Sequence, residues 1–225
     1  MTSDQTLGRD EIRDLLREVG AVLARRGSEA TIYVVGGAAM ALSFDARRTT
    51  RDVDVAFRGD RADVEQAAAE VAARHNLPPD WLNGHAAAFM SNEPDDDAAE
   101  LTLPGLRVVV ASDAHLIAMK LRSMRDRDLA DLDALFRHAG ISTPQEAADI
   151  HNRMFDKSSI GFHGPEEALY EAKAVFDRAA ALGRPIGARQ TTAPATESHD
   201  GEHWVRPHNR RGNPVEGHWR RNRNG

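Results

Sequence analysis

The chain has 225 residues and a formal net charge of −6, which is enough length for one domain with a sizeable core and an additional segment. It contains no cysteine, which excludes a disulfide framework and thiolate chemistry and suits a reducing cytoplasm. The N-terminal stretch is polar and acidic and the longest apolar stretches are far too short to cross a bilayer, so we expect a soluble cytoplasmic protein with no secretory signal and no membrane partner.

The first quarter of the chain predicts a helix followed by two strands. Apolar residues at helical spacing predict a helix over about 9–26. The apolar run TIYVV (31–35) predicts a buried strand, and the adjacent glycines Gly36 and Gly37 lead into a short helix, AAMALS. After a loop rich in arginine and threonine, the strict alternation of RDVDVAF (51–57) predicts a second strand with one face toward the core.

The middle and the end of the chain are predicted to be mostly helical. We expect a helix over 60–75, a solvated acidic loop at NEPDDDAAE, and a third strand at LRVVVA (106–111). Helical periodicity then runs from an N-cap at Ser112 to about residue 139. Two further helices are expected at TPQEAADIHNRMF and GPEEALYEAKAVFDRAAALG.

This order of elements predicts an α+β fold, in which a small mixed β-sheet is flanked by helices and followed by C-terminal helices and a flexible basic tail. We expect TIYVV, RDVDVAF and LRVVVA to share that sheet. The predicted organisation is a core over 1–140, C-terminal helices packed on the core over 141–184, and a flexible tail rich in arginine and histidine over 185–225.

The predicted tail contains an internal repeat. The pattern V-x-x-H-x-R-R occurs at 205–211 and again at 215–221, and residues 201–225 hold six arginines and two glutamates. A flexible arm with arginines and an interleaved aromatic residue is typical of a tether for nucleic acid or for an acidic partner. A solvated tail that was merely duplicated is an equally good interpretation.

The glycine pair and two aspartates carry the chemistry. Glycines between a strand and a helix permit a tight turn whose backbone N–H groups can hold phosphate. Asp52 and Asp54 lie on one face of the second predicted strand, where aspartate is disfavoured and two like charges repel each other. Two carboxylates with substrate phosphates suit Mg²⁺, with Mn²⁺ as an alternative metal. These are the groups needed for nucleotidyl transfer.

These motifs resemble those of the DNA-polymerase-β-like nucleotidyltransferases. The match consists of G-G-x(14)-D-x-D and the R-x-T-x-D-x-D pattern over 48–54. Residues 120–132, KLRSMRDRDLADL, are similar to a helix of the bacterial branch that includes the AbiEii-type toxins. The resemblance covers roughly 30–140 and implies a nucleotidyltransferase-like sheet, an NTP substrate, a tRNA or protein acceptor, and a cognate antitoxin.

The resemblance also implies the roles of individual residues. The catalytic candidates are Asp52, Asp54 and Lys120, the metal ligands are Asp52 and Asp54, and the nucleotide-binding candidates are Gly36, Gly37, Arg48, Thr50, Lys120, Asp128 and Asp131. Lys120 is expected to contact the triphosphate, although a lysine at the edge of an amphipathic helix is the alternative. On one continuous helix Lys120 and Asp131 would lie only about 20° apart around the axis.

Three hypotheses remain for the role of the protein. Many superfamily members use a third carboxylate on a later strand, and LRVVVA has none. Either Asp128 or Asp131 supplies this carboxylate, or one metal ion suffices, or the activity is lost. The first hypothesis is therefore a Mg²⁺-dependent nucleotidyltransferase that acts as a toxin. The others are an antibiotic-type enzyme with a small-molecule acceptor, and an inactive module that binds nucleotide, RNA or a partner protein.

Overall fold

A computed structural model describes the protein over residues 6–43, 49–125, 128–159 and 164–187, together with four short strands at 202–205, 208–210, 213–215 and 218–221. The chain divides into two compact units, Met1–Gly187 and Ala188–Gly225. In the described part of the chain, no helix combines the length and the apolar character that crossing a bilayer requires.

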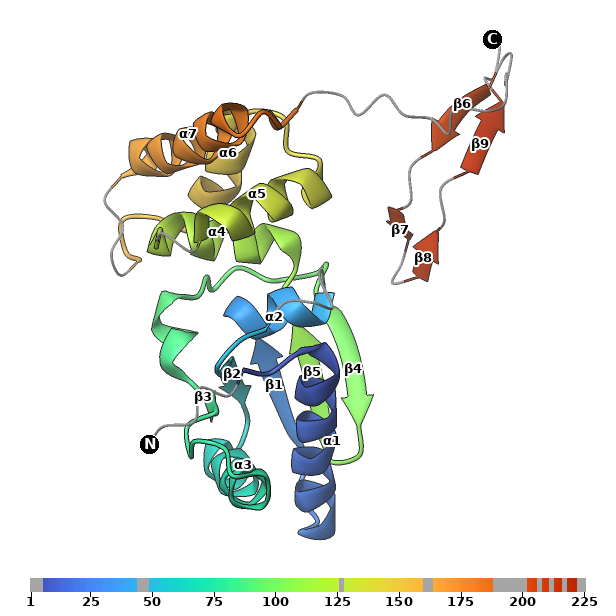
Figure 1. The fold of residues 1–225 in the computed structure, drawn as a ribbon. Coiled ribbons are helices and arrows are strands. Elements are labelled where there is room, and N and C mark those ends of the chain that lie inside the picture. Colours follow the sequence, from blue (N-terminus) through green and yellow to red (C-terminus); the bar gives the residue numbers. More distant parts are fainter. Residues whose placement is uncertain are drawn as a thin grey trace. The chain divides into compact units, whose positions relative to one another are not determined.

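The first unit is built around a five-stranded mixed sheet (Figure 1). Its elements in chain order are α1 (Arg9–Arg25), β1 (Ala30–Val34), α2 (Gly36–Ser43), β2 (Val53–Arg58), α3 (Arg61–His75), β3 (Leu82–Asn83), the 3-10 helix η1 (His85–Phe89), β4 (Ala99–Leu103), β5 (Leu106–Val110), α4 (Asp113–Ser123), α5 (Asp128–Ala139), α6 (Pro144–Met154) and α7 (Pro165–Ala181). The strand order is β3-β2-β1-β5-β4, with β1 antiparallel to β2 and parallel to β5. The predicted α+β class and the shared mixed sheet are confirmed.

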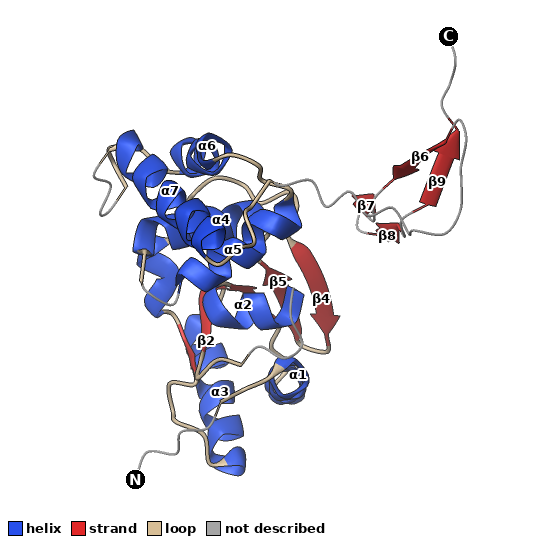
Figure 2. Ribbon diagram, turned by 45° about the horizontal axis from the view of Figure 1, so that its top comes forward, coloured by secondary structure: helices blue, strands red, loops and turns tan. Residues whose placement is uncertain are grey.

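One face of the sheet is apolar and covered by helices. Val53 and Val55 of β2 are completely buried, whereas the intervening Asp54 is only partly buried, as the alternation predicts. Helices α1 and α3 lie side by side on the apolar face (Figures 1 and 2). Helix α1 approaches the β4–β5 turn so closely that a Cβ on Gly20 would lie 2.5 Å from the Pro104 carbonyl oxygen. The opposite face of the sheet is therefore the one left for polar chemistry.

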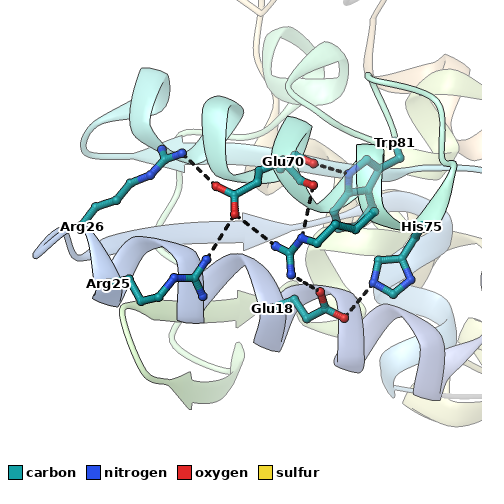
Figure 3. Close-up of polar contacts among 8 residues, drawn as sticks. Glu18, Arg25, Arg26, Glu70, His75 and Trp81 are labelled. Carbon is teal, nitrogen blue, oxygen red and sulfur yellow. Dashed lines mark hydrogen bonds and ion pairs between the residues drawn. The ribbon is translucent and has the colours of Figure 1, made fainter.

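Helices α1 and α3 are joined by an exposed ion-pair network (Figure 3). The Glu70 carboxylate accepts hydrogen bonds from Arg25 and Arg26, each at 3.2 Å. Glu18 accepts from Arg74 at 2.8 Å and lies 2.7 Å from Nε2 of His75. Exposed pairs of this kind contribute at most about 1 kcal/mol each, so the network adds little to the stability of the fold.

Helices α4 to α7 pack on one another and follow β5 in the chain. The prediction of one helix from Ser112 to about residue 139 is wrong, because α4 ends at Ser123 and α5 begins at Asp128. The Asp128 side chain causes the break: it accepts hydrogen bonds from the Ser123 hydroxyl at 2.9 Å and from the Arg125 backbone N–H at 3.0 Å. Such side-chain bonds to nearby groups compete with helical ones.

Most residues of the acidic stretch at 92–100 are exposed, as predicted, but the stretch is not a loop throughout. Its end belongs to β4, which pairs antiparallel with β5, and the Asp95 side chain is only 5% exposed.

In the second unit, β6 (Glu202–Val205) pairs antiparallel with β9 (His218–Arg221), and β7 (His208–Arg210) pairs with β8 (Asn213–Val215). This pairing joins the two sequence repeats to each other.

Candidate functional site

The glycine pair lies directly against the second aspartate of β2. Gly36 begins α2 with a φ of 64°, a left-handed conformation that favours glycine. A Cβ on Gly36 would lie 3.2 Å from Oδ2 of Asp54, and the Val35 backbone N–H donates to the Asp54 carbonyl at 3.0 Å. The fold therefore brings together the turn and the carboxylate, which lie eighteen positions apart in the sequence. Glycine keeps the space beside Asp54 open.

Thr50 is fixed against the second glycine. Its backbone pairs with Leu7, through N–H···O distances of 2.6 and 3.0 Å. A Cβ on Gly37 would lie only 2.7 Å from Oγ1 of Thr50, and that hydroxyl donates a long hydrogen bond of 3.5 Å to Asp52. Thr50 thus contacts the turn and the first aspartate, which suits the prediction that it lies at the site. Arg48 lies outside the described residues.

Asp52 and Asp54 are partly buried and follow the same face of the sheet. Two positions along a strand place their Cα atoms roughly 7 Å apart. Among the described residues, no group of three or more histidine, aspartate or glutamate side chains is arranged to hold a metal ion. Two carboxylates beside an open glycine turn nevertheless fit Mg²⁺, which commonly takes one or two protein carboxylates and completes its shell with water and phosphate oxygens.

Lys120 lies in a buried ion cluster between α4 and α5. Its Nζ donates to Oδ1 of Asp128 at 2.8 Å and to Oδ2 of Asp131 at 2.6 Å. The three residues meet across the turn between two helices and not along one continuous helix, which corrects the predicted geometry. Burial alone would raise the pKa of Asp128, but the Lys120 ammonium and the bonds from Arg125 and Ser123 lower it. Contact between Lys120 and a triphosphate stays a prediction.

The candidates for a third carboxylate are engaged elsewhere. Asp128 and Asp131 hold Lys120, and Glu100 on β4 forms an ion pair with Arg107 of β5. Glu100 pairs in register with Val109 of β5, and two strands, β1 and β5, separate its own strand from β2. The described structure therefore brings together the glycines, Thr50 and the two aspartates, and places the other predicted residues in separate contacts.

A buried polar cluster on the same face of the sheet was not predicted. The Tyr33 hydroxyl donates to Asp95, the Ser112 backbone N–H donates to the same carboxylate at 2.9 Å, and Nδ1 of His115 lies 3.3 Å from it. Nε2 of His115 faces the Glu93 carbonyl oxygen at 3.2 Å. The three side chains come from β1, the stretch before β4, and α4, so only the tertiary fold could have indicated the cluster.

The charges of this cluster are set by its contacts. Burial alone would lower the pKa of His115, but Asp95 and the Glu93 carbonyl raise it above its ordinary value. Burial alone would raise the pKa of Asp95, but bonds from His115, Ser112 and Tyr33 hold it far below its usual range. Since both ring nitrogens of His115 face acceptors, the imidazolium form is favoured and balances the aspartate.

A glycine turn that starts a helix at the end of one strand, with one carboxylate on the antiparallel neighbour and a second just before that strand, is the arrangement expected of a nucleotidyltransferase-like domain. A family model described as "Nucleotidyltransferase of unknown function (DUF6036)" matches residues 10–172, and the chain belongs to this family. Comparisons with curated proteins and with solved structures find no match. The nucleotidyltransferase-like part of the predicted resemblance is confirmed, while the AbiEii-type branch stays a prediction.

Proposed function

We propose that the protein is a Mg²⁺-dependent nucleotidyltransferase that moves a nucleoside monophosphate from an NTP to an acceptor hydroxyl. The observation that supports this proposal is the close approach of the Asp54 carboxylate to Gly36, because a turn that could bind phosphate then lies beside a carboxylate that could bind a metal ion. The N–H groups at the start of α2 would hold phosphate oxygens, helped by the positive end of the helix dipole.

Asp52 and Asp54 would hold the metal ion, and Mn²⁺ could replace Mg²⁺. When bound, the metal neutralises phosphate charge and polarises the phosphorus centre. In the transfer, the acceptor oxygen bonds to the α-phosphorus, the bond to the bridging oxygen breaks, pyrophosphate leaves with the electron pair, and the hydroxyl proton is released to buffer. Gly36 and Gly37 allow the backbone to approach the phosphates, and Thr50 orients Asp52.

We further propose an RNA acceptor such as tRNA, or a protein acceptor, and a role as a toxin with a cognate antitoxin. This part rests on the similarity of residues 120–132 to the AbiEii-type branch. Inducible expression in a bacterial host tests it: the wild type should arrest growth, and Asp54→Asn should not. Normal growth with the wild type at equal protein levels would contradict the toxin role.

The transfer itself is tested with the four α-³²P-labelled NTPs, Mg²⁺ and total tRNA or total protein, separated on a gel. We expect label from one NTP to move to one acceptor class in the wild type and to be absent with Asp52→Asn. Omission of Mg²⁺ is the matched control. Transfer that persists in Asp52→Asn would contradict the assigned metal ligand.

A nucleotide-binding protein without transferase activity is the second candidate. It is favoured by the lack of a third metal-binding side chain among the described residues. This candidate predicts that Mg²⁺–NTP stabilises the wild type while no label moves to any acceptor.

A further inference from the structure

The polar face of the sheet contains a hollow of about 610 Å³ beside β2. We call it the open-face hollow; its lining includes Tyr33, Ala56, Arg58, Asp95 and Val109, and the chain over 90–96 forms one wall. Tyr33 pairs in register with Ala56 on one side and with Val109 on the other, so these residues form the floor. The hollow is thus part of the face that carries Asp54.

The hollow lies beyond Asp54 on the side away from the glycine turn. Asp54, Ala56 and Arg58 follow one another on the same face of β2, and the Asp54 carboxylate lies beside Gly36. Phosphoryl transfer places the attacking and leaving oxygens roughly in line with the phosphorus between them. If the glycine turn holds the departing pyrophosphate, the acceptor approaches from the opposite side, which is the side of the hollow.

Arg58 brings an unpaired positive charge to this hollow. Its guanidinium carbon lies 5.1 Å from the centre of the Tyr33 ring, which is itself fixed by the hydroxyl bond to Asp95. Within the described part of the chain, no carboxylate lies within ion-pair distance of Arg58. By contrast, Arg61 stacks on Phe57 in a similar way, but its charge is paired with Glu65 at 2.7 Å.

The two buried charges beside the hollow, Asp95 and His115, compensate each other and do not compensate Arg58. Asp95 is balanced by His115, and both side chains are only 5% exposed. Glu93 and Asp96 also line the hollow, and both are exposed, as Arg58 is, so water and salt screen all three charges. A bound anion would meet a guanidinium held over the Tyr33 ring, while the one buried carboxylate of the lining, Asp95, is paired with His115.

We infer that the open-face hollow is the acceptor subsite and that Arg58 binds a phosphate next to the acceptor hydroxyl, as at the 3′ end of an RNA strand. The guanidinium lies over Tyr33, which pairs in register with Ala56 of β2. Since Ala56 is two residues from Asp54, the guanidinium lies roughly 7 Å along the strand from Asp54. That spacing suits a phosphodiester on the nucleotide whose hydroxyl attacks. The inference rests on the proposed function, since it takes the direction of approach from the transfer reaction.

The test compares acceptors that differ by a single phosphodiester. Full-length protein is titrated with adenosine and with the dinucleotide ApA, and with uridine and UpU, by calorimetry without NTP. The wild type should bind each dinucleotide at least about tenfold more tightly than the nucleoside, as expected for a charge-assisted hydrogen bond. Arg58→Gln should remove this preference, and the matched control Arg61→Gln should keep it.

The remaining outcomes separate the subsite from the proposed function. Equal affinity of the wild type for nucleoside and dinucleotide, or an undiminished preference in Arg58→Gln, would overturn the inference. Weaker binding of Mg²⁺–NTP by Arg58→Gln would also overturn it, because the hollow would then belong to the nucleotide. A wild type that shows the preference but ignores Mg²⁺–NTP would overturn the transferase and leave Arg58 as a phosphate ligand. Thermal melting of each variant confirms that it is folded.

Discussion

The buried cluster of Lys120 with Asp128 and Asp131 yields a quantitative prediction. The side chains of Lys120 and Asp128 are 9% and 5% exposed, and the ammonium donates to both carboxylates. Lys120→Met keeps most of the volume of the side chain but removes the ammonium group that is bonded to both buried carboxylates. Breaking a buried ion pair from one side costs about 3–5 kcal/mol.

This cost corresponds to a large change in thermal stability. For a protein of this size, 1 kcal/mol lowers Tm by about 2–4 °C, so Lys120→Met should lower it by roughly 6–20 °C at pH 7. The effect depends on pH, because the lowered pKa of Asp128 means that its stabilising contribution is present above the ordinary aspartate pKa and is lost as pH falls through the folded value. The difference between wild type and variant should therefore persist down to about pH 4 and shrink as pH falls below that value.

Circular dichroism melts at pH 7 and about pH 3 measure both effects. The control is Lys173→Met, which changes an exposed lysine of α7 and should move Tm little. The structural role would be refuted if Lys120→Met melted like the wild type at pH 7 but lost its response to Mg²⁺–NTP. That result would instead make the Lys120 ammonium a nucleotide ligand.

Three further changes test other parts of the structure. Gly37→Ala should cost about 1–3 kcal/mol in urea unfolding, because its Cβ would lie 2.7 Å from the hydroxyl of Thr50; unchanged stability would contradict the tight turn. His115→Gln should destabilise the protein most at low pH. Because the pKa of His115 is raised in the folded protein, its stabilising contribution is fully present below the ordinary histidine pKa and is lost as pH rises through the folded-state pKa. Equal losses of stability at about pH 6 and pH 9 would argue against the pairing of His115 with Asp95. Deletion of 188–225 should leave Tm nearly unchanged in calorimetry, since the first unit has its own core, and a large drop would show that the second unit contributes to that core.

The sheet and the centre of the candidate site follow from local sequence patterns. Alternation in RDVDVAF is enough to put Asp52 and Asp54 on one face, and the apolar runs of β1 and β5 are typical of central strands. The glycine pair at a strand end predicts the turn. These signals are local, because strand alternation and glycine conformation depend on neighbouring residues only.

The parts that sequence reasoning missed depend on tertiary contacts. The break before α5 comes from hydrogen bonds of the Asp128 side chain, and no glycine or proline there interrupts the helical pattern. Asp95 stands in a run of three aspartates that reads as solvated, and only the approach of Tyr33 and His115 distinguishes it from its neighbours. The unpaired charge of Arg58 is likewise visible only once the strand register is known.

The most direct test of the nucleotide site is the affinity of the protein for each of the four NTPs with Mg²⁺, measured by calorimetry on the wild type, Asp54→Asn and Asp97→Asn. Asp97 is an exposed aspartate outside the site and serves as the matched control. We predict that the wild type and Asp97→Asn bind at least one Mg²⁺–NTP with the same affinity, and that Asp54→Asn binds it at least about tenfold more weakly, because an amide is a poor ligand for Mg²⁺. No binding by the wild type, or equal binding by Asp54→Asn, would contradict the assignment of Gly36 and Asp54 to a metal–nucleotide site.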